Sequence, residues 1–285
     1  MIKPGASDLV AGFSLVELMI AMTIGLVLIA GAVQIFGASK QGFTLQQGAA
    51  RAQESGRVGS FMLSRTLRQA GYYRNPMLQV QEVPAQFPAI ANTRVPLAFV
   101  AGAAGTGSDG TSGAPDTVSV RFQSNEDGSM VDCLGNAVNC TLNVTCPPAD
   151  SSVCNATAAC TANPTASPNI AVNTFSVSPV DANTGTRSLQ CRRDIFASDG
   201  TSIVANDSQP LIEGVTDFQV TYGIDTNTDR MADRYVTASD VTDWTAVTDM
   251  RFVLTTNSVD QVGAGASTGQ RLTQTYQETI QLRNK

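Results

Sequence analysis

The sequence contains no histidine among its 285 residues. This absence excludes Ser-His-Asp and Cys-His nucleophile pairs, histidine-ligated zinc or haem, and imidazole proton shuttles. The chain has only three lysines, Lys3, Lys40 and Lys285, so a Ser-Lys pair in a folded core is also disfavoured. Charged residues make up 15% of the chain, against about 25% in an ordinary soluble domain. We therefore expect no enzymatic activity.

The few charges are unevenly distributed along the chain. Residues 13–74 hold six basic and two acidic side chains, whereas residues 75–285 hold 11 basic and 21 acidic ones. The second region would repel the phosphates of a nucleic acid, and no basic patch with interleaved aromatic residues offsets that repulsion. We therefore expect no nucleic-acid partner.

A long apolar run lies near the N-terminus, at residues 13–36, and Glu17 is its only charged residue. A helix of 24 residues is about 36 Å long, enough to cross a bilayer core of about 30 Å. A cleaved secretory signal would have a shorter apolar region preceded by a basic stretch. A simple membrane anchor explains the length of the run but not the acid, which costs several kcal/mol at that depth unless it is paired, about 2.5–3.5 on insertion scales.

The start of this run resembles the processing site of type IV pilins and pseudopilins, in the sequence Gly12-Phe13-Ser14-Leu15-Val16-Glu17-Leu18. The resemblance implies a leader at 1–12, cleavage between Gly12 and Phe13 by a prepilin peptidase, and N-methylation of Phe13. The new Phe13 ammonium of one subunit could then neutralise Glu17 of its neighbour, which makes Glu17 the expected assembly residue.

Helical character is predicted to continue from the membrane-spanning half, 13–36, through an amphipathic half, 37–74, and to end near Tyr73. No proline lies between Phe13 and Arg74. Small and apolar residues recur about every 3.6 positions and define one helix face. That face either packs on the protein's own sheet or contacts neighbouring helices in a bundle or filament. The stripe comprises Leu45, Ala49, Ala52, Gly56, Gly59, Leu63, Leu67 and Ala70.

The remainder, residues 75–285, is predicted to form a β-rich head. Apolar residues alternate in 117–124, 217–223, 249–256 and 271–284, which predicts antiparallel strands exposed on one side. The glycines of Gly105-x-Gly107-x-x-Gly110 match a dinucleotide fingerprint nominally, but no helical pattern follows them. We interpret this segment as a flexible loop.

Six cysteines lie in the head, and no CxxC pair occurs among them. With no histidine to assist, disulfides in an oxidising compartment are favoured over a metal cluster. They would stabilise a poorly patterned insertion at about 132–191 by restricting the unfolded chain. Their pairing is left open by the sequence. The cysteines are Cys133, Cys140, Cys146, Cys154, Cys160 and Cys191.

An acidic segment follows the strand predicted at 217–223. Side-chain oxygens at Asp225, Asn227, Asp229 and Asp233, with the backbone carbonyl of Met231, have the spacing of a calcium-binding loop. The segment resembles the calcium loops of dockerins and of some pilus-associated proteins. It departs from an EF-hand because Arg230 replaces the turn glycine and Val236 the bidentate glutamate. Calcium is the one candidate cofactor, and the alternative interpretation of the segment is a solvated acidic turn without a bound ion.

Taken as a whole, the chain resembles a minor pilin of the PilW type over residues 12–74, about 211–236 and 276–284. The segments 68–73 and 222–225 and the closing Leu282-Arg283-Asn284 add to the resemblance. It implies an α+β fold, with a long N-terminal helix packed on an antiparallel head. It also implies a single-pass protein of the bacterial inner membrane with a periplasmic head, which later enters the pilus.

The implied function is that of a non-enzymatic subunit that primes type IV pilus assembly, with the pilus tip as a candidate location. The implied partners are other minor pilins, the major pilin, the prepilin peptidase and the pilus assembly platform. One alternative is a pseudopilin of type II secretion, similar to the J-type subunit. A second alternative is a membrane-anchored adhesin or hydrolase that acts through its head.

Overall fold

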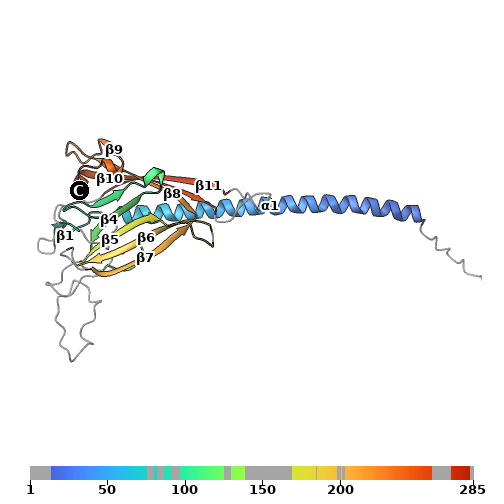
Figure 1. Ribbon diagram of the computed structural model, residues 1–285, viewed down its shortest axis with the longest axis horizontal. Coiled ribbons are helices and arrows are strands. Elements are labelled where there is room, and N and C mark those ends of the chain that lie inside the picture. Colours follow the sequence, from blue (N-terminus) through green and yellow to red (C-terminus); the bar gives the residue numbers. More distant parts are fainter. Residues whose placement is uncertain are drawn as a thin grey trace, which may run out of the picture.

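The computed structural model consists of one long helix and a β-rich head (Figure 1). The residues that it describes are 14–75, 80–81, 87–90, 97–124, 130–138, 169–183, 185–197, 200, 203–258 and 271–282.

The helix, α1, spans Leu15–Leu67 and contains 53 residues. Its N-cap residue Ser14 is extended and accepts a hydrogen bond at its carbonyl from the Leu18 N–H. The predicted end near Tyr73 is wrong, because the chain leaves the helix after Leu67. Gly71 adopts a left-handed φ of 78° and donates its N–H to the Arg121 carbonyl of the head. A glycine tolerates this conformation, which lets the chain turn from the helix onto the sheet.

Two antiparallel sheets make up most of the head. The four-stranded sheet has the order β11-β10-β8-β9, and the five-stranded sheet has the order β3-β4-β5-β6-β7. The four-stranded sheet consists of β8 (Val215–Ile224), β9 (Arg234–Val236), β10 (Val247–Asn257) and β11 (Thr273–Gln281). The five-stranded sheet consists of β3 (Gly105–Ser108), β4 (Thr117–Gln123), β5 (Ile170–Val177), β6 (Ser188–Phe196) and β7 (Ile203–Glu213). A short pair, β1 (Arg74–Asn75) and β2 (Val80–Gln81), and 3-10 turns at Thr111–Gly113, Ala238–Asp240 and Trp244–Ala246 complete the described elements.

All four segments predicted as strands are strands, namely β4, β8, β10 and β11. The prediction of a poorly patterned insertion at about 132–191 is wrong for its second part. Residues 170–177 form β5, a central strand, and β6 begins at Ser188. Both strands are paired on both sides, so backbone hydrogen bonding to neighbours organises a segment that has little visible sequence pattern.

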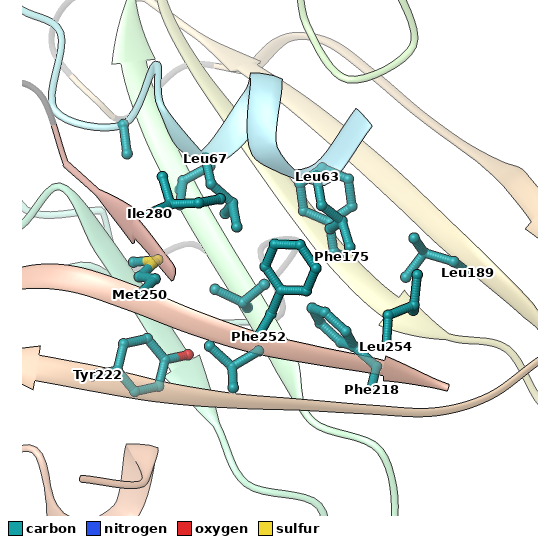
Figure 2. Close-up of a cluster of buried hydrophobic side chains, with 14 of the residues drawn as sticks. Leu63, Leu67, Phe175, Leu189, Phe218, Tyr222, Met250, Phe252, Leu254 and Ile280 are labelled. Atoms are coloured by element: carbon teal, nitrogen blue, oxygen red, sulfur yellow. The ribbon is translucent and has the colours of Figure 1, made fainter. Parts of the chain in front are cut away.

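The main core lies between the two sheets and is closed along one side by α1 (Figure 2). Leu63 and Leu67 of the helix are fully buried and face aromatic side chains from both sheets, among them Phe175 of β5 and Phe252 of β10. The helix contacts β11, β10 and β7, which include the edge strands of the two sheets. This arrangement confirms that the predicted stripe packs on the protein's own sheets from Ala52 to Ala70, whereas Leu45 at its start is exposed.

Strand β4 differs from the prediction because it is buried on both faces. A second cluster lies on its other face, where Phe87 and Phe99 pack with side chains of β5 and β6. Arg121 reaches into this cluster and donates to the carbonyls of Ala103 (2.6 Å) and Val100 (2.8 Å) and to that of Pro88. Its guanidinium lies 4.6 Å and 4.9 Å from the Phe87 and Phe99 ring centroids. Burial lowers the pKa of Arg121 to about 9, while the carbonyls and rings compensate the buried cation.

The glycine-rich segment is wrongly predicted as a flexible loop, because Gly105–Ser108 is the edge strand β3. A Cβ at Gly105 would overlap the Met250 side chain, and one at Gly107 would overlap the Tyr222 hydroxyl. The glycines therefore allow β3 to lie directly against side chains of the opposite sheet.

Candidate functional site on the N-terminal helix

The first half of α1 projects beyond the head and exposes its apolar side chains (Figure 1). From Leu15 to Phe36 its large side chains are mostly more than half exposed, for example Leu28 at 68%. By length and composition α1 can cross a membrane, and its most apolar window has no buried residue. Such a surface needs a lipid or protein environment to cover it.

Glu17 lies in the first turn of α1 and is exposed. Among the described residues it has no ion-pair or hydrogen-bond partner. Gly12 and Phe13, between which cleavage is predicted, lie outside the described residues. The structure thus leaves the Glu17 carboxylate available on the apolar half of the helix, where pairing with another subunit would neutralise it.

The second half of α1 approaches the head closely through two glycines. A Cβ at Gly56 would overlap the Tyr276 ring of β11, and one at Gly59 would overlap the Ile212 side chain of β7. The Tyr276 hydroxyl donates to the Gln53 carbonyl over 2.9 Å. Small residues in the stripe therefore serve contact between the helix and its own head.

A polar seam joins the same half of α1 to β11. The Glu278 carboxylate accepts hydrogen bonds from the Ser60 hydroxyl (3.2 Å) and the Ser64 hydroxyl, and it pairs with Arg68 at 3.2 Å. Because the seam uses side chains from both elements, it orients the helix as well as attaching it.

The acidic segment Asp225–Asp233 forms an exposed loop between β8 and β9. The Asp225 carboxylate accepts hydrogen bonds from the backbone N–H groups of Asn227, Thr228 and Arg230. The Asp233 carboxylate accepts one from the Thr226 N–H and one from the Thr226 hydroxyl. Asp229 accepts from the Met231 N–H, and the Asn227 side chain bridges Asp229 and Asp233.

These hydrogen bonds lower the pKa values of two loop carboxyls. For Asp225, desolvation opposes the shift and the backbone N–H groups outweigh it; for Asp233, the Thr226 hydroxyl contributes most. Thr228 and Arg230 both have left-handed φ values, 66° and 69°. No group of three or more His, Cys, Asp or Glu side chains is positioned to hold a metal within the described ranges. Calcium binding by this loop therefore stays a prediction.

One of the predicted disulfides is present and joins Cys133 to Cys191, with Cα atoms 6.3 Å apart. It ties the turn at 132–135 to β6 across 58 positions of sequence. Cys140, Cys146, Cys154 and Cys160 lie outside the described residues, so their pairing stays a prediction.

Comparison with known families is consistent with this division of the chain. Residues 9–33 match the model of the prokaryotic N-terminal methylation motif, and residues 174–284 match the model described as type IV pilus-assembly protein W, PilW. The chain is therefore similar to the PilW family over part of its head and to type IV pilins over the start of α1. The methylation motif covers the start of the exposed apolar half of α1. The match also extends the resemblance found by sequence, because the PilW domain begins at residue 174 and includes β6 and β7.

Comparison of whole chains adds two findings. No curated protein matches. Among solved structures, a type IV-like pilin from Thermus thermophilus aligns over 82% of this chain and 98% of its own, with 15% identity and a TM-score of 0.41. The match to the methylation motif and the apolar helix fit a membrane-anchored pilin.

Sequence reasoning missed the buried Arg121 of the head. The alternation of the strand predicts that Arg121 is exposed to solvent. Nothing in the local sequence indicates that Phe87 and Phe99 cover it. The glycines at 56 and 59 were identified by their spacing, whereas the use of Glu17 between subunits stays a prediction.

Proposed function

We propose that this protein is a non-enzymatic minor pilin that joins other minor pilins in an inner-membrane complex, primes type IV pilus assembly and remains at the pilus tip. The observation that carries the proposal is the division of α1. The second half packs on the head, whereas the first half carries the methylation motif, an exposed apolar surface and the carboxylate of Glu17.

The PilW match favours a pilus over the type II secretion alternative. In this proposal the head is periplasmic, the leader faces the prepilin peptidase, and the assembly platform receives the processed subunit. The hydrolase alternative gains no support from the loop carboxylates of Asp229 and Asp233, because each accepts a backbone hydrogen bond from its own loop.

Replacement of Glu17 by Ala or Gln tests the proposal. We expect cleavage after Gly12 to continue while incorporation into sheared pili falls at least fivefold, because the Phe13 ammonium loses its partner. Immunoblots of membrane and pilus fractions measure incorporation, and mass spectrometry of the N-terminus measures cleavage. Glu54→Gln, an acid-to-amide change on the outer face of the same helix, serves as the control. Normal piliation with Glu17→Ala would contradict the pairing.

We retain calcium binding by the loop at 225–233 as a separate proposal. Calorimetric titration of the full chain with Ca²⁺ tests it, alongside a variant that carries both Asp225→Ala and Asp229→Ala. We expect heat from the wild type and none from the double variant. Absence of heat from the wild type would end the idea.

A further inference from the structure

On the outer face of the second half of α1, the described part of the head leaves Phe61 and Arg65 exposed. Arg57, Phe61, Arg65 and Arg68 recur at steps of four, four and three residues and therefore share one face of the helix. The opposite face, with Gly59 and Leu63, is buried against the sheets. We call the exposed pair at the centre of the outer face, Phe61 and Arg65, the Phe61–Arg65 ridge.

Grooves lie on both sides of this ridge. One has a volume of about 550 Å³ and lies between α1 and β11, with Tyr276 and Glu278 on its far wall. The other has a volume of about 240 Å³ and lies between α1, β7 and the turn that contains Cys133. Phe61 and Arg65 line both grooves, so a ligand on the ridge has hollows for side chains on either side.

Of the three arginines on this surface, Arg65 at its centre is the one without an ion pair among the described residues. Arg57 pairs with Glu54 at 2.8 Å, and Arg68 pairs with Glu278 at 3.2 Å. Glu278 is also shared with Ser60 and Ser64. Arg65 has neither an ion pair nor a hydrogen bond within the described part of the chain, and it is exposed. A carboxylate from outside the subunit is the group that this surface lacks.

Phe61 adds an apolar anchor to the same surface, since 65% of its area is exposed. Lipid does not explain this exposure, because Phe61 lies 25 residues beyond the apolar run, or about 37 Å along the helix. An exposed aromatic ring beside an arginine is typical of the central residues of protein interfaces.

We propose that the Phe61–Arg65 ridge docks an acidic segment of a different pilin subunit, which places a carboxylate on Arg65 and an apolar side chain against Phe61. This inference rests on the proposed function, which supplies neighbouring subunits. It adds a second contact to the one made by the membrane half of α1, and it is electrostatically specific.

Two other occupants fit the charges less well. The acidic loop of a second copy carries Arg230 and Arg234 beside its three aspartates, so it brings cations toward the ridge. A nucleic acid would extend past the ridge over the head, where residues 75–285 hold 21 acids against 11 bases. A short acidic protein segment meets the arginines and avoids that repulsion.

Photo-crosslinking in piliated cells tests the proposal. A benzophenone amino acid replaces Phe61 in the full chain, and adducts are mapped at the peptide level by mass spectrometry. We expect an adduct with an acidic segment of another pilin that falls at least fivefold when Arg65→Glu is added. Arg234→Glu is the same charge reversal on β9, at the edge of the four-stranded sheet opposite β11, and it should leave the adduct unchanged. Reversal of an acid in the mapped segment should restore the adduct with Arg65→Glu.

Several results would overturn the proposal: no adduct, an adduct with a second copy or with the chain's own head, a nuclease-sensitive adduct, or one that is insensitive to Arg65→Glu. Equal thermal unfolding of the Arg65→Glu and wild-type chains excludes misfolding as the cause of a loss. Failure here differs from failure of the proposed function. If the adduct is missing although Glu17→Ala still lowers incorporation into pili at least fivefold, the docking surface alone is rejected.

Discussion

The two halves of α1 have the same secondary structure and opposite surroundings. From Leu15 to Phe36 the helix carries large apolar residues that the head leaves exposed, whereas from Ala52 to Leu67 one face of it is buried. Glycines occur in both halves, but added side chains would meet nothing at Gly25 or Gly31 and would collide at Gly56 and Gly59. One continuous helix thus has a first half whose large apolar side chains the described head leaves exposed and a second half that packs one face on that head.

The largest expected difference between the halves comes from leucine truncation. Leu63→Ala should lower the free energy of unfolding of the head by about 3 kcal/mol, because a fully buried side chain leaves a cavity. Leu28→Ala, in the exposed half, should leave it unchanged. Denaturant unfolding of the full chain in detergent measures both, followed by the fluorescence of Trp244, which packs on Tyr222 with ring centroids 4.9 Å apart. Equal unfolding of the two variants would contradict the division.

The glycines give the next largest effect. Gly56→Ala should cost the head about 2 kcal/mol, because the new methyl group displaces the Tyr276 ring and its hydrogen bond to Gln53. Gly31→Ala should leave unfolding of the head unaltered and raise helix propensity in detergent by about 1 kcal/mol. The same fluorescence measurement, with circular dichroism for the helix, separates the two outcomes. A Gly56→Ala chain as stable as the wild type would show that the close approach is unnecessary.

Much of this division could be predicted from the sequence. The 3.6-residue stripe identified the buried face because only one face of an amphipathic helix can meet a sheet. The alternation in β8 and β10 identified their strands. Strand β7 escaped detection because it contains Pro210, which is tolerated on the outer strand of the sheet. Glycines concealed β3, since the contact that requires them comes from the opposite sheet.

Of the two candidate contact sites on α1, the sequence indicated Glu17 but not the Phe61–Arg65 ridge. Glu17 was recognised because a charge within an apolar run is a local signal. The Phe61–Arg65 ridge was not, because an arginine every few residues also describes an ordinary solvated face. The structure distinguishes Arg65, which has no ion pair among the described residues, from Arg57, which pairs with Glu54 of α1, and Arg68, which pairs with Glu278 of β11.

The smallest effect concerns polar contacts of the helix half that faces the head. Glu278→Gln should lower the free energy of unfolding by about 1 kcal/mol, because the seam to Ser60, Ser64 and Arg68 loses its charge. Glu54→Gln removes an acid from an exposed pair within α1 and should change unfolding little, since solvent screens that pair. Urea titrations of the two variants at low salt measure the difference. If the two variants unfold alike, the seam attaches the helix no more firmly than a surface ion pair does, and burial of the Leu63 face alone holds α1 on the head.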